Sequence, residues 1–167
     1  MKQLLLCRHA KSSWKNPSLA DRDRPLNKRG KRNAPIMGRR LITRMMLPER
    51  IFCSPAKRAK KTAVLLCHGM KQPTDIIINK DAIYDTNVRG LLRIIRSIDD
   101  RYQRVMLVGH NFELTDLVNF LLQIDLYNVP TCGIVACRCK TDNWKQIGRS
   151  HAELLFFDYP KKPGCGC

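Results

Sequence analysis

The chain has 167 residues, 44% of them apolar, and its 31 Lys and Arg against 14 Asp and Glu give a formal net charge of +17. This length suits one domain with a sizeable core, and the apolar share argues against intrinsic disorder. No apolar run is long enough to span a membrane, and the N-terminus shows no secretory cleavage pattern. We therefore expect a cytoplasmic protein with no membrane partner.

Strands and helices are predicted to alternate through the first half of the chain. Short apolar runs predict strands, and apolar periodicity predicts helices. In chain order we expect a strand over residues 2–7, a polar loop over 12–26, a helix over about 28–45, a strand over 50–53, a helix over about 56–69 and a strand beginning at 76. Asn27 is expected to cap the first helix, which Pro35 can disturb, and Gly69 to end the second.

The second half continues this alternation and then changes to strands alone. We expect a helix over residues 87–98, a strand over 104–108, a helix over 112–123, strands over 134–137 and 153–157, and a further strand near 144–147. Alternation predicts a mostly parallel sheet covered on both faces, and the last strands add an antiparallel edge. The prediction is one domain over residues 1–159 followed by a C-terminal tail over 160–167.

Eight cysteines raise the question of disulfides or a metal. Several lie in apolar runs, where a thiol acts as a small hydrophobic group, and we expect them to be reduced. Two Cys-x-Cys pairs, Cys137 with Cys139 and Cys165 with Cys167, could supply four thiolates to zinc. Their spacing is narrower than usual and the second pair lies in the predicted tail. No metal is therefore assigned, although zinc binding by these pairs stays open.

The densest basic stretch runs from Arg22 to Arg44 and explains much of the charge. A solvated helix face is one interpretation, and a surface that attracts phosphate esters is the other. The stretch contains no aromatic residue on which bases could stack, which disfavours nucleic acid as a partner.

The residues that can carry chemistry follow three predicted strands. Arg8 and His9 follow the first strand, Arg58 lies just beyond the second, and His110 follows the strand over 104–108. Open α/β sheets bind ligands beyond the carboxyl ends of their strands. A neutral imidazole is nucleophilic, a guanidinium fork matches phosphate oxygens, and a protonated second imidazole can donate hydrogen bonds to a transferring phosphoryl group. The pattern predicts a phosphoryl-transfer site.

Two other kinds of phosphate chemistry do not fit the sequence. A cysteine phosphatase needs five residues between Cys and Arg, and only four separate Cys53 from Arg58. A nucleotide-hydrolysing P-loop needs a Gly-rich loop that ends in Gly-Lys-Ser/Thr, and the chain has none.

Taken together, these segments resemble the histidine phosphatase superfamily and, within it, the short SixA-type phosphohistidine phosphatases. The resemblance covers about residues 2–158 and is carried by residues 4–11, 54–63 and 108–111, by Asp23-Arg24-Pro25-Leu26 with Gly30, and by Pro130-Thr131. It implies a phosphoglycerate mutase-like fold, a three-layer α/β/α sandwich with a mostly parallel sheet and an antiparallel edge.

The resemblance also implies roles for individual residues. His9 would be the nucleophile that forms a phosphohistidine intermediate, and Arg8, Arg58 and His110 would complete the catalytic set. Substrate contacts are expected from Arg24, Lys11 and Asn111. Water would then release inorganic phosphate from His9, with no metal or organic cofactor required.

The chain departs from the family pattern at two places. Ala10 stands where many members have glycine, and its small side chain keeps the turn accessible. Larger members carry an acid that protonates the leaving group, for which Asp85 is the local candidate here. An alkoxide needs such a donor, whereas the imidazole released from phosphohistidine needs little help. The weak acid therefore favours phosphohistidine on a protein as the substrate.

Two alternatives stay open. The chain could hydrolyse a small phosphorylated metabolite. It could also be a non-catalytic protein that binds polyanions on a phosphatase scaffold, since a charge of +17 attracts any anion.

Overall fold

The fold is seen in a computed structural model that describes residues 1–149 and 152–162. Within these residues the strands form one six-stranded sheet in the order β3-β2-β4-β1-β5-β6. The strands are β1 (Gln3–Arg8), β2 (Arg50–Cys53), β3 (Ile77–Asn79), β4 (Arg104–Gly109), β5 (Ile134–Cys139) and β6 (Ala152–Asp158). β1, β2, β3 and β4 are parallel, whereas β5 is antiparallel to both β1 and β6. The predicted antiparallel edge is confirmed.

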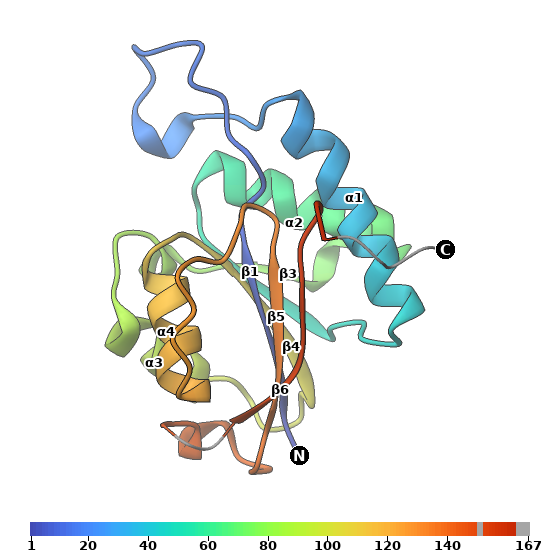
Figure 1. The fold of residues 1–167 in the computed structure, drawn as a ribbon, viewed down its shortest axis with the longest axis vertical. Helices are drawn as coiled ribbons and strands as arrows, with labels where there is room; N and C mark the ends of the chain where they lie inside the picture. Colours follow the sequence, from blue (N-terminus) through green and yellow to red (C-terminus); the bar gives the residue numbers. More distant parts are fainter. Residues whose placement is uncertain (150–151, 163–167) are drawn as a thin grey trace.

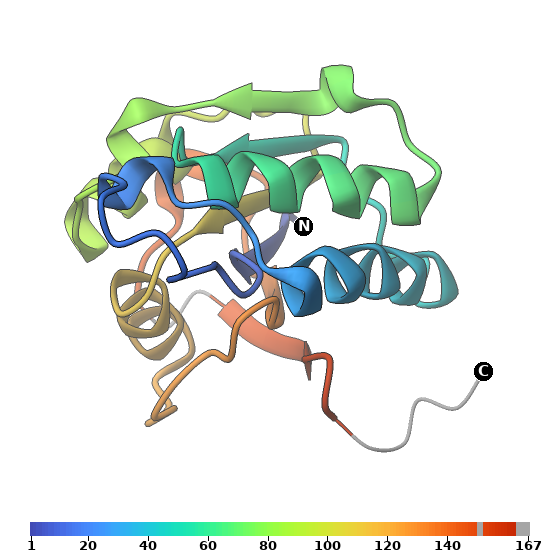
Figure 2. The same ribbon diagram turned by 90° about the horizontal axis from the view of Figure 1, so that it is seen from above.

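Helices cover both faces of the sheet, which makes three layers (Figures 1 and 2). They are α1 (Lys28–Thr43), α2 (Lys57–Met70), α3 (Val88–Arg96) and α4 (Glu113–Leu122), with 3-10 turns at η1 (Asp21–Asp23), η2 (Thr74–Ile76), η3 (Asp81–Ile83) and η4 (Trp144–Gln146). α1 and α2 pack on one face, and α3 and α4 pack on the other. The predicted α/β/α sandwich is confirmed.

β1 lies in the middle of the sheet and divides the core between the two faces. Successive strand side chains point to opposite faces. Leu5 and Cys7 accordingly pack with α1 and α2, while Leu4 and Leu6 pack with α3 and α4. Because the strand is buried on both faces, its sequence is a continuous apolar run and not an alternating one.

The helix ends agree with the sequence at Asn27 and differ from it at Gly69. Asn27 caps α1 by accepting a hydrogen bond from the Gly30 amide at 2.8 Å, and α1 continues through Pro35 to Thr43. Gly69 does not end α2, which runs to Met70 and closes with Lys71 in the left-handed region. Gly69 is needed inside the helix because a Cβ there would lie 2.2 Å from the Pro35 carbonyl oxygen of α1.

The strand predicted near residues 144–147 is wrong, because this segment forms η4. The Trp144 side chain is buried, and its indole N–H donates to the Tyr102 carbonyl at 2.9 Å. The 3-10 turn directs this large ring into the core. Trp144 and Ile147 are both buried apolar residues, and in the sequence they resemble the pattern of a short strand.

The structure describes one of the two Cys-x-Cys pairs and the first residues of the predicted tail. Cys137 and Cys139 are buried and free, and burial raises the pKa of both thiols. Cys165 and Cys167 lie outside the described residues, as do residues 163–167 of the predicted tail. Across the described ranges no group of three His, Cys, Asp or Glu side chains could hold a metal, and no helix there is long and apolar enough to cross a membrane.

Candidate active site

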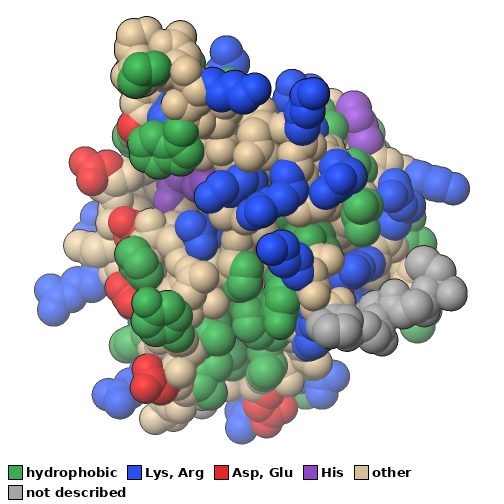
Figure 3. Space-filling view, turned by 45° about the horizontal axis from the view of Figure 1, so that its top comes forward, with side chains coloured by type: hydrophobic (Ala, Val, Ile, Leu, Met, Phe, Trp, Pro, Cys, Tyr) green, Lys and Arg blue, Asp and Glu red, His purple; other side chains and the backbone are tan. Residues whose placement is uncertain are grey.

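Three neighbouring strands bring the sequence-predicted residues to one edge of the sheet. Parallel pairing sets Arg8 beside Gly109 and Cys53 beside Val108. Just past these pairs, the His9 amide donates to the Gly109 carbonyl and the Ser54 amide to the Val108 carbonyl, both at 3.0 Å. Residues that follow β1, β2 and β4 are therefore held together by backbone hydrogen bonds. Figure 3 shows histidine at this edge with Lys and Arg side chains beside it.

His9 is buried, and its ring is held in one orientation. Nδ1 lies 2.8 Å from the Ala10 carbonyl oxygen, which can only accept, so Nδ1 carries the proton. Nε2 accepts a hydrogen bond from Arg58 Nε at 3.3 Å. Burial, together with the nearby His110 and Arg58, lowers the pKa of His9 to about 3. His9 is therefore a neutral imidazole whose Nε2 lone pair faces the guanidinium of Arg58.

His110 lies beside His9, with 5.1 Å between the ring centroids. Its Nδ1 is 3.3 Å from Arg58 Nη2 and its Nε2 is 2.7 Å from Ser54 Oγ. Because arginine can only donate, Nδ1 accepts and Nε2–H donates to Ser54. Burial and Arg58 lower the pKa of His110 to about 4. The ring is thus neutral here, unlike the protonated imidazole expected from the sequence, and a phosphoryl dianion nearby would raise its pKa.

Arg58 joins the two histidines to a carboxylate that the sequence analysis did not select. Its Nη2 lies 2.7 Å from Asp21 Oδ2, and its Nη1 donates to the Asp21 carbonyl oxygen. α2 supplies Arg58 from its first turn, and η1 supplies Asp21 from the polar loop. The guanidinium is buried, so these partners fix its position.

Asp21 is itself held by three donors. Besides Arg58, Arg24 Nη1 donates to Oδ1 and the Tyr84 hydroxyl donates to Oδ2, each at 3.0 Å. Burial acts to raise the pKa of Asp21, but the hydrogen bonds from Arg58 and Tyr84 outweigh it and the pKa falls below its usual value. The one sequence signal for Asp21 is an Arg three residues later, a spacing that one helical turn brings together.

Arg24 is a part of this loop structure and does not reach the histidines. Its Nη2 donates to Ser12 Oγ at 2.9 Å, its Nε to the Ser13 carbonyl at 3.3 Å, and its guanidinium stacks on Trp14. Its hydrogen bond to Asp21 Oδ1 helps to fix the position of that carboxylate. Lys11 is half-buried at the base of the same loop, and its carbonyl accepts from the Asn27 amide at 3.0 Å.

Arg8 is anchored by the segment that precedes β5. Its Nη1 donates to Asn128 Oδ1 at 3.0 Å and to the Val129 carbonyl at 2.8 Å. Asn111 Nδ2 donates to the same Asn128 oxygen at 2.5 Å. Arg8 Nε is buried and has no partner among the described residues. A buried donor without an acceptor is costly, and it is satisfied if an anion binds beside it.

A cavity of about 530 Å³ opens at this site. Four of the predicted site residues line it, namely Arg58, His110, Asn111 and Asp85, whereas His9, Arg8, Lys11 and Arg24 do not; Asp21, Tyr84 and Glu113 complete the lining. Glu113 Oε2 is buried without a hydrogen-bond partner in the described part of the chain. The cavity therefore offers three carboxylates, Asp21, Asp85 and Glu113, beside His110, where the sequence pointed to one.

Comparison with known proteins agrees with this geometry. A sequence model of the histidine phosphatase superfamily (branch 1) matches residues 4–81, which contain His9, Asp21 and Arg58. An uncharacterized chloroplastic protein of Arabidopsis thaliana is 43% identical over 157 residues, covering 87% of this chain and 70% of its own.

Solved structures with the same fold include SixA proteins. A candidate phosphohistidine phosphatase SixA from Agrobacterium tumefaciens is 26% identical with a TM-score of 0.80, covering 95% of this chain and 98% of its own. A protein histidine phosphatase SixA complexed with tungstate has a TM-score of 0.78 at 17% identity, covering 95% of this chain and 97% of its own. The second likeness concerns the fold alone.

Proposed function

The chain belongs to the histidine phosphatase superfamily, and we propose that it hydrolyses phosphohistidine on a protein with His9 as the nucleophile. Family membership supports phosphatase activity. The observation that carries the proposal is the pair of neutral imidazoles, His9 and His110, both in contact with the guanidinium of Arg58. Two ring nitrogens and a fixed fork around one space suit a tetrahedral phosphoryl group.

In the first step Arg58 Nε turns from His9 Nε2 to the phosphoryl oxygens, the freed lone pair of Nε2 attacks phosphorus, and the N–P bond of the substrate breaks. The released imidazole leaves neutral when its other ring nitrogen is protonated. His9 becomes a phosphorylated imidazolium that keeps its Nδ1 proton, and the Ala10 carbonyl at 2.8 Å stabilises that positive charge. Arg58 and the free Nε of Arg8 donate to the phosphoryl oxygens as charge develops on them, and His110 does so once the phosphoryl dianion has raised its pKa and Nδ1 has taken up a proton from solvent.

In the second step water attacks the phosphorus of phosphorylated His9. The Nε2–P bond breaks, its electron pair returns to Nε2, and the proton of the attacking water leaves with the phosphate. His9 is again neutral and hydrogen bonded to Ala10. Neither step uses a metal ion or an organic cofactor in this proposal.

The carboxylates at the cavity separate the possible substrates. Asp21 is ionised, because Arg58, Arg24 and Tyr84 all donate to it, and an ionised carboxylate cannot donate a proton. Asp85 and Glu113 remain as candidate acids. A phosphohistidine that carries a proton on its other ring nitrogen releases neutral imidazole without an acid from the protein, whereas an alkyl phosphate must release an alkoxide unless an acid protonates it. Phosphohistidine therefore needs neither of these two acids, whereas a sugar phosphate requires one of them to act as the proton donor.

The nucleophile is tested with a His9→Gln variant. Glutamine fills similar space but cannot form a stable phosphoryl adduct, so turnover of phosphoramidate should fall by at least 10³-fold. Wild-type protein quenched during turnover of radiolabelled substrate should carry label that is stable to alkali and lost in acid. Retention of activity in the variant, or label on another residue, would disprove the role of His9.

The substrate class is tested with leaving groups. We expect kcat/KM to be highest for a phosphohistidine peptide, lower for para-nitrophenyl phosphate and lowest for an alkyl phosphate such as glucose 6-phosphate. An alkyl phosphate turned over as well as the peptide would favour the small-metabolite alternative. No turnover of any of the three would favour the non-catalytic alternative.

A further inference from the structure

A second cavity of about 240 Å³ lies on the β5 side of the sheet, separate from the cavity that holds Arg58 and His110. It is enclosed by the start of α1, by the turn before β5 and by the segment that follows β6. Its lining residues are Arg29, Asn33, Pro130, Thr131, Tyr159, Pro160 and Lys161. We call it the α1–β6 pocket.

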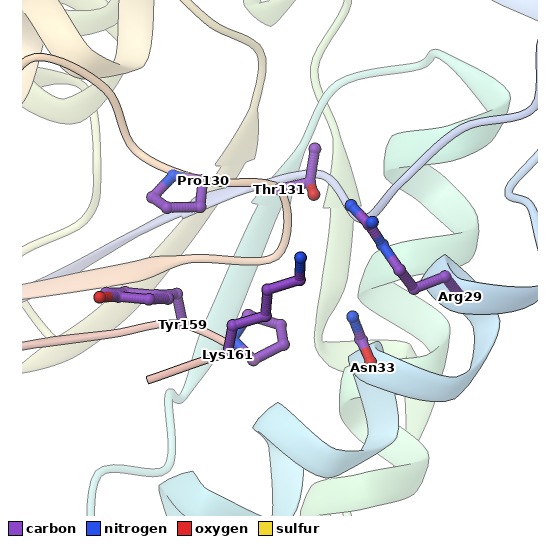
Figure 4. Close-up of a pocket in the computed structure, with 7 residues that line it drawn as sticks. Arg29, Asn33, Pro130, Thr131, Tyr159 and Lys161 are labelled. Carbon is purple, nitrogen blue, oxygen red and sulfur yellow. The ribbon is translucent and has the colours of Figure 1, made fainter. Parts of the chain in front are cut away.

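Polar donors from separate parts of the chain converge on this pocket. Figure 4 shows the nitrogens of Arg29, Asn33 and Lys161 directed toward one space, with the Thr131 hydroxyl close by. Arg29 and Asn33 are four residues apart on α1 and so share one helix face. None of the described residues that line the pocket is Asp or Glu. The pocket therefore presents two positive charges and neutral donors with no carboxylate of its own.

The protein does not neutralise these two charges internally. Asp158, at the end of β6, accepts from Arg40 Nη1 at 2.9 Å and from Arg44 Nη2 at 3.2 Å, and it is 1% exposed. The negative charge of Asp158 is therefore paired with Arg40 and Arg44, which lie at the other end of α1 from Arg29. Within the described ranges, the side chains of Arg29 and Lys161 make no hydrogen bond and no ion pair. Both residues are exposed, so their charges are open to an anionic group of another molecule.

The walls of the pocket are joined to the segment that carries the nucleophile. Thr131 precedes Cys132, whose amide lies 3.1 Å from the Arg8 carbonyl oxygen and 3.2 Å from that of His9. Arg29 precedes Gly30, where a Cβ would lie 2.3 Å from the Lys11 carbonyl oxygen. Residues 8–11 are thus in backbone contact with Cys132 and Gly30, each of which is adjacent in sequence to a residue that lines the α1–β6 pocket. Figure 3 shows Lys and Arg side chains continuing from the histidine across this face.

We propose that the α1–β6 pocket binds an acidic side chain of the phosphorylated protein substrate while its phosphohistidine reaches His9. Arg29 and Lys161 bind the carboxylate, and the rings of Tyr159 and Pro130 contact its methylene stem. A carboxylate on a short apolar stem matches both the cations and the rings, whereas a bare inorganic anion uses the cations alone. This inference rests on the proposed function. It specifies in addition that the substrate carries an acidic residue near its phosphohistidine.

The first test uses a charge reversal at the pocket. In Arg29→Glu/Lys161→Glu protein we expect kcat/KM for a phosphohistidine peptide to fall at least tenfold when the peptide carries Glu one to four residues from the phosphohistidine. Turnover of phosphoramidate, which has no second anionic group, should change less than twofold. A Glu at position 29 lies in the first turn of α1, where the helix dipole favours it, so the variant should fold.

The matched control is Arg39→Glu/Lys61→Glu, which makes the same change in net charge on exposed parts of α1 and α2. An equal loss in this control would mean that net charge acts and the pocket does not. Equal losses for phosphoramidate and the acidic peptide, or no loss for either, would also overturn the proposal. A wild-type protein that turns over neither would contradict the proposed function itself.

A binding experiment tests whether the pocket binds an acidic peptide, independently of phosphatase activity. An unphosphorylated peptide with the same Glu residues is titrated into the wild-type protein while amide signals are followed by NMR. We expect shifts at Arg29, Asn33 and Thr131 that disappear in the Arg29→Glu/Lys161→Glu variant. Shifts there with inorganic phosphate and none with the peptide would overturn the assignment to a protein side chain.

Discussion

The protonation of His9 is set by two neighbours of opposite effect. The Ala10 carbonyl holds the proton on Nδ1, and burial beside Arg58 keeps the ring from taking a second one. A ring with these contacts is a nucleophile over a wide pH range, because protonation would require bringing another positive charge into a buried site that holds Arg58. The resemblance named His9, but only the surroundings explain why it is neutral.

This environment predicts how stability depends on pH. The pKa of His9 is 6.5 unfolded and about 3 folded, so the unfolded chain binds the extra proton as pH falls. The stabilisation is fully present above pH 6.5 and is lost as the pH falls toward 3. Between pH 7 and 5 we expect urea unfolding to show about 2 kcal/mol more loss in wild type than in His9→Gln. Equal losses would mean that buried His9 titrates normally.

At the scale of elements, the active site depends on how closely α1 and α2 approach each other. α2 carries Arg58, and α1 follows the loop that carries Asp21. The helices touch through glycines: a Cβ on Gly38 would lie 2.4 Å from the Leu66 carbonyl oxygen, and one on Gly69 would lie 2.2 Å from that of Pro35. Backbone contact of this kind leaves no room for a side chain and holds Arg58 opposite Asp21.

A Gly69→Ala substitution tests this contact. Alanine favours a helix interior over glycine by about 1 kcal/mol, but here its methyl group would meet the backbone of α1. We expect the unfolding free energy to fall by roughly 1–3 kcal/mol, as overpacking usually costs. Lys61→Ala on the exposed face of α2 is the control and should change it little. Higher stability in Gly69→Ala would show that the helices can separate freely.

At the scale of the whole molecule, a net charge of +17 accompanies a site that we propose binds a phosphoryl group. Long-range attraction raises the rate at which anionic substrates meet the protein, and salt screens it. The catalytic contacts are buried and are screened much less. Net charge therefore acts on capture of the substrate and not on the chemical step.

The expected signature is a salt dependence of kcat/KM. For an acidic phosphohistidine peptide we expect kcat/KM to fall about tenfold between about 0.02 M and 0.5 M salt, with kcat nearly constant. Phosphoramidate carries fewer charges and should show a smaller decrease. A fall in kcat of the same size would mean that salt disturbs the site itself.

Local signals in the sequence determined most elements and the strand ends at which the site lies. Apolar runs and a cap such as Asn27 act through neighbouring residues, so they can be recognised without the fold. These signals gave a wrong prediction at Gly69, whose role depends on its contact with α1. They also gave a wrong prediction at residues 144–147, where the Trp144 side chain is buried and donates a hydrogen bond to the Tyr102 carbonyl.

Tertiary structure alone decided which carboxylate faces Arg58. Asp21, Asp23 and Asp85 are similar in the sequence, and the pairing of Asp21 with Arg58 spans 37 residues. The same is true of Arg29 and Lys161, which come from opposite ends of the chain and share one pocket. Such pairings depend on how distant backbone segments meet, because the Coulomb energy between two charges depends on their separation in space and not along the chain.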